Sequence, residues 1–275
     1  MNVTCVRSCD MGTKMNSVVA PAKEKDPSPP VLIIGHRGAM GHAPENTRAS
    51  FEAGLRLGAE AVECDVHLSK DGQPVVIHDE TVDRTTNGRG LVRKKIWADL
   101  QRLDAGSWFG RGFAREKLWR LDDLFDWAKS RRTKTGALLQ VVVELKTNSG
   151  NARSLVQQTV AVLKKRGMVG RVILISFNPK AMTQAKVSCP RLRTGLLLRT
   201  IPQDLPRRMA LSRAEWVFPR FTLLTDRFTR EARQRGWFVG TWTVNERLDL
   251  KRVLRLRVNA IASNFPERLV RLRSS

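Results

Sequence analysis

The stretch AVECDVHLSKDGQPVVIHD, residues 61–79, decides the fold. Its first part is an apolar run in which Glu63 and Asp65 alternate with Val and Cys, so both carboxylates lie on one face of a predicted strand. Lys70-Asp71-Gly72 is typical of a hairpin turn, and the second apolar run, 74–78, follows it. Parallel neighbours need a crossover of about a dozen residues or more, and this linker is too short. We therefore predict that 74–78 folds back as an antiparallel arm.

The hairpin also predicts where His78 lies. Folding the chain about Asp71-Gly72 places position 78 opposite position 64 or 65, depending on whether the loop has three residues or two. Either register brings His78 beside Asp65. Cys64 has the opposite strand parity, so we interpret it as a packing residue.

The rest of the chain alternates short apolar runs with longer helix-like stretches. The runs are 31–35, 60–66, 74–78, 140–145, 172–176, 194–198, 215–219, 238–243 and 259–263. Without the hairpin arm, eight runs remain, which is typical of an α/β protein with a (β/α)₈ TIM barrel and an insertion after the second strand.

The domain organisation follows from the same pattern. Residues 1–30 are polar and proline-rich towards their end, which predicts a disordered or extended lead-in. Residues 31–275 form the predicted barrel, and about 79–117 is the insertion, rich in Gly and Arg, with the length of a lid or substrate-recognition element.

Helix boundaries are indicated by capping residues. Asn46 or Thr47 is predicted to cap a helix that carries Phe51. The other predicted helices are 152–166 ending at Gly167, 226–235 ending at Gly236, and 246–257 capped by Asn245.

The charge is unusual: the chain carries +23, with a pI near 11.1. Residues 191–275 hold 18 Arg and one Lys against seven acidic side chains, which is +12 of this total. Such a surface attracts anions and is compatible with peripheral contact with an anionic membrane through the C-terminal third, for example through Arg247, Lys251 and Arg255 at helical spacing. The favoured interpretation of the charge is a basic, solvated surface. Dedicated nucleic-acid binding is not expected, since zinc-finger spacing and an aromatic RNA-binding motif are both missing.

The cysteines and the N-terminus bear on location. Cys5, Cys9, Cys64 and Cys189 form no C-x-x-C pair, which favours a reducing compartment. The first residues do not resemble a secretory signal, and no segment has the 18 apolar residues of a membrane span. We therefore expect a cytoplasmic protein.

Candidate catalytic groups lie at strand ends. Reactive groups of barrel enzymes gather at the carboxyl ends of the strands, where this sequence places His36, Glu63, Asp65 and Glu144. Glu63 and Asp65 side by side are costly to bury unless a cation or protons neutralise them, and an all-oxygen site suits one Mg²⁺ or Ca²⁺. His36 and His78 would then transfer protons. We expect His42 and His67 to be structural, the latter carried away from the barrel mouth by the hairpin.

The ordered motifs along the chain resemble those of the glycerophosphodiester phosphodiesterase family. The matching motifs are HRG (36–38), PENT (44–47), Phe51-x-Ala53, Gly58-Ala59, Glu63-x-Asp65-Val66, KDGxPVVxHD (70–79), DRTTxG (83–88), ELK (144–146), Ser176-Phe177 and WTVN (242–245). The resemblance covers about residues 31–267. It implies a TIM barrel that cleaves glycerophosphodiesters into glycerol 3-phosphate and an alcohol.

The resemblance also implies roles for individual residues. The family's metal positions fall on Glu63, Asp65 and Glu144, and its acid/base histidines fall on His36 and His78. Its phosphate contacts fall on Arg37 and Lys146, and Trp242 matches an aromatic that lines the glycerol pocket. Two segments depart from the family pattern and bear on pocket shape and alcohol preference: 118–121, where IPTL is usual, and 257–266, where GVDGIITDxP is usual.

Two other functions are compatible with the same residues. A lysophospholipase D-like enzyme would use the same site on lysophospholipids at membranes, and a non-catalytic anion-binding barrel would keep the basic surface without the reaction. The sequence leaves open which histidine is the acid and which the base.

Overall fold

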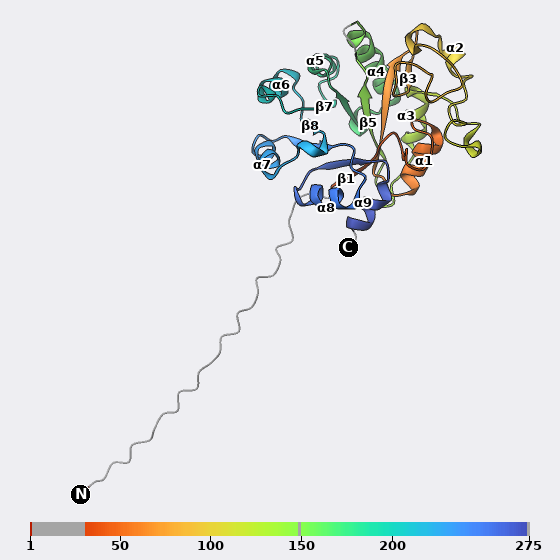
Figure 1. Cartoon of the computed structure of the whole chain (residues 1–275). Coiled ribbons are helices and arrows are strands. Elements are labelled where there is room, and N and C mark those ends of the chain that lie inside the picture. The colour runs from red at the N-terminus through yellow and green to blue at the C-terminus, as the bar shows by residue number, and fades with distance from the viewer. Residues whose placement is uncertain (2–30, 148–149, 274–275) are drawn as a thin grey trace.

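The computed structural model describes Met1, residues 31–147 and residues 150–273, and Figure 1 shows them as a barrel of strands surrounded by helices. The predicted lead-in, 1–30, lies outside the described residues apart from Met1. The strands are β1 (Leu32–Gly35), β2 (Ala61–Leu68), β3 (Pro74–Val76), β4 (Trp119–Arg120), β5 (Gln140–Leu145), β6 (Val172–Ser176), β7 (Arg193–Leu198), β8 (Trp216–Pro219), β9 (Phe238–Thr241) and β10 (Ala260–Ser263).

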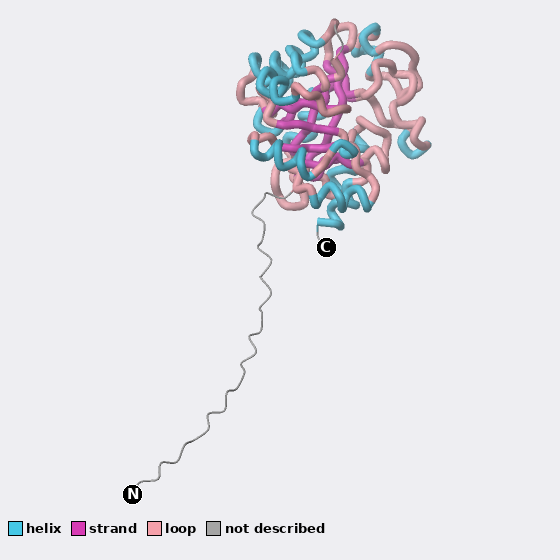
Figure 2. The backbone as a smooth tube through the Cα atoms, turned by 60° about the vertical axis from the view of Figure 1, so that its left-hand side comes forward, coloured by secondary structure: helices cyan, strands magenta, loops and turns pink. Residues whose placement is uncertain are grey.

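The strands β1, β2 and β5 to β10 close into a barrel of parallel neighbours. Each pairs with the next, and β1 pairs with both β10 and β2, which completes the ring. The predicted (β/α)₈ fold is therefore confirmed. In Figure 2 the strands lie inside and the helices outside.

The helices follow the strands around the barrel. They are α1 (Arg48–Arg56), α2 (Trp97–Leu100), α3 (Leu121–Lys129), α4 (Ala152–Arg166), α5 (Pro179–Ser188), α6 (Leu205–Ser212), α7 (Asp226–Gln234), α8 (Arg247–Arg255) and α9 (Pro266–Arg273). Among the described helices, none is long and apolar enough to cross a membrane.

The predicted hairpin is confirmed. β3 runs antiparallel to β2, with Val66 opposite Val76 and Leu68 opposite Pro74. The same register places His78 opposite Cys64, which is the three-residue alternative, and the backbone N–H of Ile77 donates to the carbonyl of Asp65. The other edge of β3 pairs antiparallel with the short strand β4, which the sequence did not predict.

Strand parity divides the apolar side chains into two layers. Val62, Cys64 and Val66 of β2 are fully buried in the outer layer between the strands and the helices. Cys64 is thus a packing residue, as predicted. The barrel interior is filled by inward-facing side chains, which are Ile34, Ala61, Val142, Ile173, Ile175, Leu197, Trp216, Phe218, Ala260 and Ala262.

The barrel interior leaves no room for a methyl group at position 240. A Cβ there would lie 2.1 Å from a ring carbon of Phe218. We predict that Gly240→Ala lowers the free energy of unfolding by about 1–3 kcal/mol, because the core must shift to admit it. Denaturant unfolding measures this, with Gly170→Ala as the control, since nothing lies within 4 Å of a Cβ at Gly170. Equal stability of the two variants would contradict the packing.

The insertion has a small core of its own. It contains α2 and two short 3₁₀ helices, Val92–Lys94 and Arg111–Phe113, among turns. The buried apolar side chains of the insertion pack against Val75 and Ile77 of the hairpin arm and against Leu118. The insertion contributes Val82, Val92, Leu100 and Ala105 to this cluster. The insertion is therefore attached to β3, close to His78.

One open alternative among the predicted helix ends is resolved, and one predicted end needs correction. Thr47 caps α1, since its hydroxyl accepts from the N–H of Ser50, while the Asn46 amide turns to Asp65 instead. Asn245 does not cap α8, which begins at Arg247 after Glu246. The Asn245 side-chain oxygen instead accepts the N–H of Asn264, so a tertiary contact has replaced the local one. The end of α4 at Gly167, in the left-handed conformation, is as predicted.

Candidate active site

Charged and ionisable side chains lie at the carboxyl ends of the strands. There the side chains that face into the barrel change from apolar to polar. On β5, Val142 fills the barrel, and Glu144 and then Lys146 follow it on the same face. On β2, Ala61 is followed by Glu63 and Asp65. These polar positions form one rim because all barrel strands are parallel.

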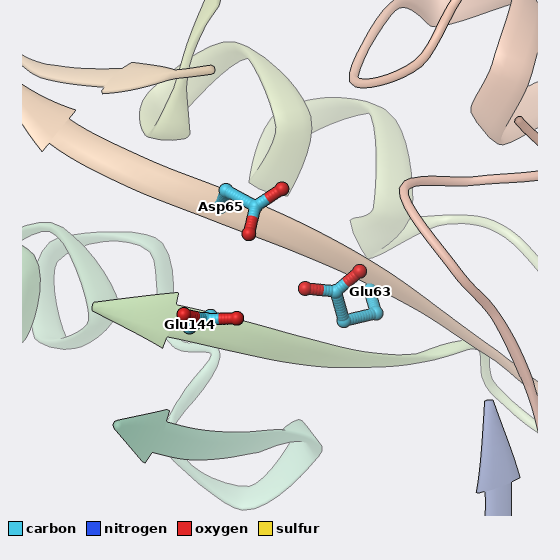
Figure 3. A group of neighbouring side chains, drawn as sticks. All are labelled: Glu63, Asp65 and Glu144. Carbon is cyan, nitrogen blue, oxygen red and sulfur yellow. The ribbon is translucent and has the colours of Figure 1, made fainter. Parts of the chain in front are cut away.

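Three carboxylates meet at this rim. Glu63, Asp65 and Glu144 each offer an oxygen, and these oxygens lie within 4.8 Å of one another. Asp65 is directly opposite Glu144 in the pairing of β2 with β5. Figure 3 shows the three side chains on these two neighbouring strands. The structure thus brings together the three residues that the sequence suggested as metal ligands.

Burial and mutual repulsion disfavour three negative charges here. Burial raises the pKa of Glu63 well above its usual value, and Asp65 and Glu144 raise it further. Burial and the Asp65 charge raise the pKa of Glu144 to about 7. Burial would also raise the pKa of Asp65, but Lys146 and Arg37 hold it below its ordinary value. A divalent cation would restore both displaced carboxylates to their charged form, so the donor set fits a hard dication.

Two cationic side chains contact the carboxylates. Lys146 Nζ lies 2.7 Å from Glu144 Oε1 and 2.9 Å from Asp65 Oδ1. The Arg37 backbone N–H donates to Glu63 Oε2 at 2.9 Å, and its guanidinium donates to Glu45 Oε1 at 2.7 Å. The buried Nε of Arg37 lies 3.3 Å from Asp65 Oδ2 without a hydrogen bond to any described group.

The backbone around Arg37 is shaped to present that side chain. Arg37 adopts a left-handed φ of 49°, and its carbonyl accepts the Ser50 hydroxyl at 2.7 Å. Gly38 follows with φ 89°, and a Cβ there would lie 2.4 Å from the backbone of Ser50. The HRG motif therefore needs glycine at position 38 so that the loop can approach α1.

His36 is held by an amide. Its Nδ1 donates to Asn264 Oδ1 at 2.8 Å, since an amide oxygen accepts, and its Nε2 lies 4.0 Å from Glu63 Oε2. Burial, together with the neighbouring Arg37 charge, lowers the pKa of His36 to about 4. Near neutral pH the ring is therefore uncharged, with an unprotonated Nε2 facing the carboxylates.

His78 is held by a carboxylate instead. Its Nδ1 bonds to Asp79 Oδ1 at 2.6 Å, and Arg84 also contacts Asp79. Burial lowers the pKa of His78, although Asp65 and Asp79 oppose this change. Arg84 reaches Glu45 as well, at 2.8 and 2.9 Å, so the insertion is connected to Arg37 through one chain of ion pairs.

A cavity of about 110 Å³ opens above the barrel filling, and both histidines line it. Phe177 and Trp242 form one wall, with ring centroids 5.7 Å apart and their planes nearly perpendicular. Trp242 is fixed by a hydrogen bond from its ring N–H to the carbonyl of Phe218. The cavity therefore combines charged groups on one side with an apolar, aromatic wall on the other.

Of the remaining two histidines, one lies apart from the carboxylate cluster and one lies near it. His42 lies apart from the cluster, 3.1 Å from Glu267, as expected of a structural residue. His67 is closer than predicted, because β2 continues to Leu68 before it turns. Its Nε2 donates to the carbonyl of His78, and the ring lines a second cavity beside Glu144 and Lys146.

The sequence interpretation missed several residues of the rim. Asn46, Asp79 and Arg84 lie inside motifs that were recognised, and their polar side chains next to a candidate ligand or histidine were an available signal. Asn264 lies in the segment 257–266, which was noted as a departure from the family pattern but was given no role at the site. Arg199 carried no such signal, because it approaches the site from a distant strand.

The fold and the rim together define the class of barrel enzymes that hydrolyse phosphoric diesters. The model of the glycerophosphoryl diester phosphodiesterase family matches residues 36–268, and the chain belongs to this family. The resemblance seen in the sequence is thereby confirmed.

Relatives and solved structures agree with this assignment. A glycerophosphodiester phosphodiesterase of Caldanaerobacter subterraneus subsp. tengcongensis is 34% identical over 242 residues, which is 88% of this chain and 97% of the relative. A phosphodiesterase of Oleispira antarctica, solved with the product sn-glycerol-3-phosphate, has a TM-score of 0.82 and 29% identity, covering 90% of this chain and 98% of that one. A Silicibacter pomeroyi structure described as a glycerophosphoryl diester phosphodiesterase has a TM-score of 0.81 and 27% identity, covering 90% of this chain and 94% of that one.

Proposed function

We propose that this protein hydrolyses glycerophosphodiesters to glycerol 3-phosphate and an alcohol at the carboxyl-end rim of its barrel. The observation that carries the proposal is the meeting of three carboxylate oxygens within 4.8 Å, beside a cavity that His36 and His78 line. Family membership and the product named in the Oleispira antarctica structure support the same substrate class.

Glu63, Asp65 and Glu144 are proposed to hold one divalent cation, Mg²⁺ or Ca²⁺. Their all-oxygen donor set and the raised pKa values of Glu63 and Glu144 support a hard dication. When bound, the cation would polarise the phosphoryl group and offset its negative charge. Lys146 contacts two of the same carboxylates, so we expect its ammonium to turn from them towards the phosphate when the cation is present.

His36 is proposed as the general base. Its neutral amide partner, Asn264, fixes the tautomer without stabilising a positive ring, so Nε2 is available to take a proton from the nucleophile. The nucleophile is water, or it is the glycerol hydroxyl next to the phosphate. In the second case the alcohol leaves from a cyclic phosphate, which water then opens to glycerol 3-phosphate.

His78 is proposed as the general acid. The Asp79 carboxylate at 2.6 Å stabilises the protonated ring, which can then donate its Nε2 proton to the departing alcohol oxygen. Asp79 is itself held by Arg84, and this contact with the Arg84 guanidinium lowers the pKa of Asp79 to about 2.

Arg37 and Trp242 are proposed to position the substrate. The Arg37 Nε is buried and makes no hydrogen bond within the described residues, which supports its assignment to a phosphoryl oxygen. Trp242 and Phe177 would cover the carbon skeleton of the glycerol moiety. Together these groups would hold the phosphate between the two imidazoles.

A product-resolved assay tests the proposed reaction. With added Mg²⁺ or Ca²⁺, we expect the protein to release glycerol 3-phosphate from glycerophosphocholine, and chelation with EDTA should stop the release. Faster turnover of lysophosphatidylcholine would instead favour the lysophospholipase D-like alternative. Steeply salt-dependent anion binding without any hydrolysis would favour a non-catalytic barrel.

Peripheral contact with an anionic membrane is also proposed. On α8, Arg247, Lys251 and Arg255 are exposed along one helix, and Leu248 beside them is 81% exposed. Such a face attracts anionic lipids, and its other interpretation is a solvated surface. Co-sedimentation with phosphatidylserine vesicles that falls on Arg247→Ala and Lys251→Ala would support the contact. Equal sedimentation of wild type and variant would refute it.

A cytoplasmic location is proposed from the cysteines. Cys64 and Cys189 are buried, unpaired thiols, as is common in a reducing compartment. Fractionation of cells that express the protein tests this location, and recovery outside the cytoplasm would contradict it.

A further inference from the structure

A second cavity, larger than the first, adjoins the proposed catalytic centre. Its volume is about 300 Å³, against about 110 Å³ for the cavity that the histidines line. The two cavities share Glu144, Lys146, Phe177 and Arg199, so they meet at the metal-ligand and phosphate positions. A phosphodiester has two substituents on one phosphorus, and two cavities that meet at this point can each receive one of them.

The side chains that line the two cavities indicate which substituent each cavity receives. The smaller cavity has the aromatic wall assigned to glycerol, and both proposed proton-transfer residues line it. The second cavity is therefore the place for the alcohol that leaves. Its additional walls come from the hairpin and the insertion, through His67, Glu80 and Arg93.

The second cavity carries an excess of positive charge. Arg93 and Arg199 line it, and neither has a carboxylate within 4.0 Å in residues 31–147 and 150–273. Arg37 and Arg84, by contrast, each have two carboxylates within 4.0 Å. Beyond the proposed ligand Glu144, the acidic side chain among the described lining residues is Glu80, so two guanidiniums face one carboxylate.

The same cavity is poorly suited to a quaternary ammonium group. Among the described lining residues, Phe177 is the one phenylalanine, tyrosine or tryptophan, and Arg199 already lies over its ring, 4.4 Å from the centroid. Trp242 contacts Phe177 in an edge-to-face arrangement, which restricts the ring further. A choline headgroup would meet a guanidinium where it needs an open aromatic face.

We propose that Arg93 and Arg199 select glycerophosphodiesters whose leaving alcohol carries its own anionic group, a carboxylate or a phosphate. Guanidiniums bind both groups through paired N–H donors, and Arg199 is held in place by Phe177 before the substrate arrives. This inference rests on the proposed function and adds the class of alcohol to it.

Matched substrate pairs test the preference. Glycerophosphoserine differs from glycerophosphoethanolamine by one carboxylate, and glycerophosphoinositol 4-phosphate differs from glycerophosphoinositol by one phosphate. We expect wild-type kcat/KM to be about tenfold higher or more for the anionic member of at least one pair. The pair that shows the larger ratio identifies carboxylate or phosphate as the group recognised.

Variants connect the preference to the two arginines. Arg93→Gln and Arg199→Gln should each lower the anionic-to-neutral ratio about tenfold, and Arg89→Gln, an exposed arginine elsewhere in the insertion, should leave it unchanged. The ratio of kcat/KM values is compared because a purely structural defect lowers kcat/KM equally for both substrates of a pair. Ratios near or below one for both pairs in the wild type, or ratios that the two variants do not alter, would overturn this inference while hydrolysis itself continues. Failure to hydrolyse any of the four substrates would refute the proposed function instead.

Discussion

Replacing His36 or His78 with glutamine is expected to lower kcat for glycerophosphodiester hydrolysis by about 10²–10⁴-fold, the usual contribution of general acid–base catalysis. Glutamine keeps a polar group of similar reach but cannot exchange a proton near neutral pH. In the sequence, His36 precedes the hairpin of β2 and β3 and His78 follows it. The two rings have different partners, an amide for His36 and a carboxylate for His78. Neither can therefore replace the other.

His42→Gln is the matched control for these variants. His42 bonds to Glu267 on the outside of the site, so its loss should leave kcat within about twofold of wild type. Thermal unfolding of all three variants separates loss of chemistry from loss of fold. Near-normal kcat in either His36→Gln or His78→Gln would overturn the acid–base assignment.

Replacing Glu63 with glutamine is expected to make the cation-free protein more stable while abolishing hydrolysis. Glu63 is only 4% exposed, and its raised pKa shows that burial and like charges disfavour its ionised form. A glutamine can still accept the N–H of Arg37, so removing the charge should raise the free energy of unfolding by about 1–2 kcal/mol. The same change removes a proposed ligand, and we expect activity to fall below detection.

Denaturant unfolding with and without Mg²⁺ or Ca²⁺ measures both effects. The cation should stabilise the wild type, since it binds only the folded cluster, and should do little for Glu63→Gln. Glu52→Gln is the control, because Glu52 pairs with Arg48 on the surface of α1. If the cation-free Glu63→Gln protein were less stable than wild type, Asp65 and Glu144 would not repel the Glu63 carboxylate in the way that this prediction requires.

The barrel could be predicted because its determinants are local. The eight strand runs are short and apolar, and the linker before Pro74 is too short for a parallel crossover, so the hairpin could be separated from the barrel. Strand parity then placed Glu63 and Asp65 on one face, and the register of β2 with β5 places Asp65 opposite Glu144. These features follow from spacing along the chain, which a sequence displays directly.

The residues that hold the catalytic groups could not be predicted in the same way. Asn264 reaches His36 from across 228 positions of sequence, and Arg84 reaches Glu45 from the irregular insertion. Asn245 shows the same limit. Its side chain is suited to cap the helix that follows, but its oxygen instead accepts the backbone N–H of Asn264. Contacts of this kind depend on the closed barrel, which brings together segments whose separation carries no local signal.

The central claim is that Glu63, Asp65 and Glu144 jointly hold one hard dication. A crystal structure of the protein soaked in Mn²⁺, a substitute for Mg²⁺ with a usable anomalous signal, tests it most directly. We predict one anomalous peak about 2.0–2.6 Å from an oxygen of each carboxylate, with Lys146 displaced from at least one of its two ion pairs. A map without a peak among these three side chains, with Lys146 still bound to both Asp65 and Glu144, would contradict the claim.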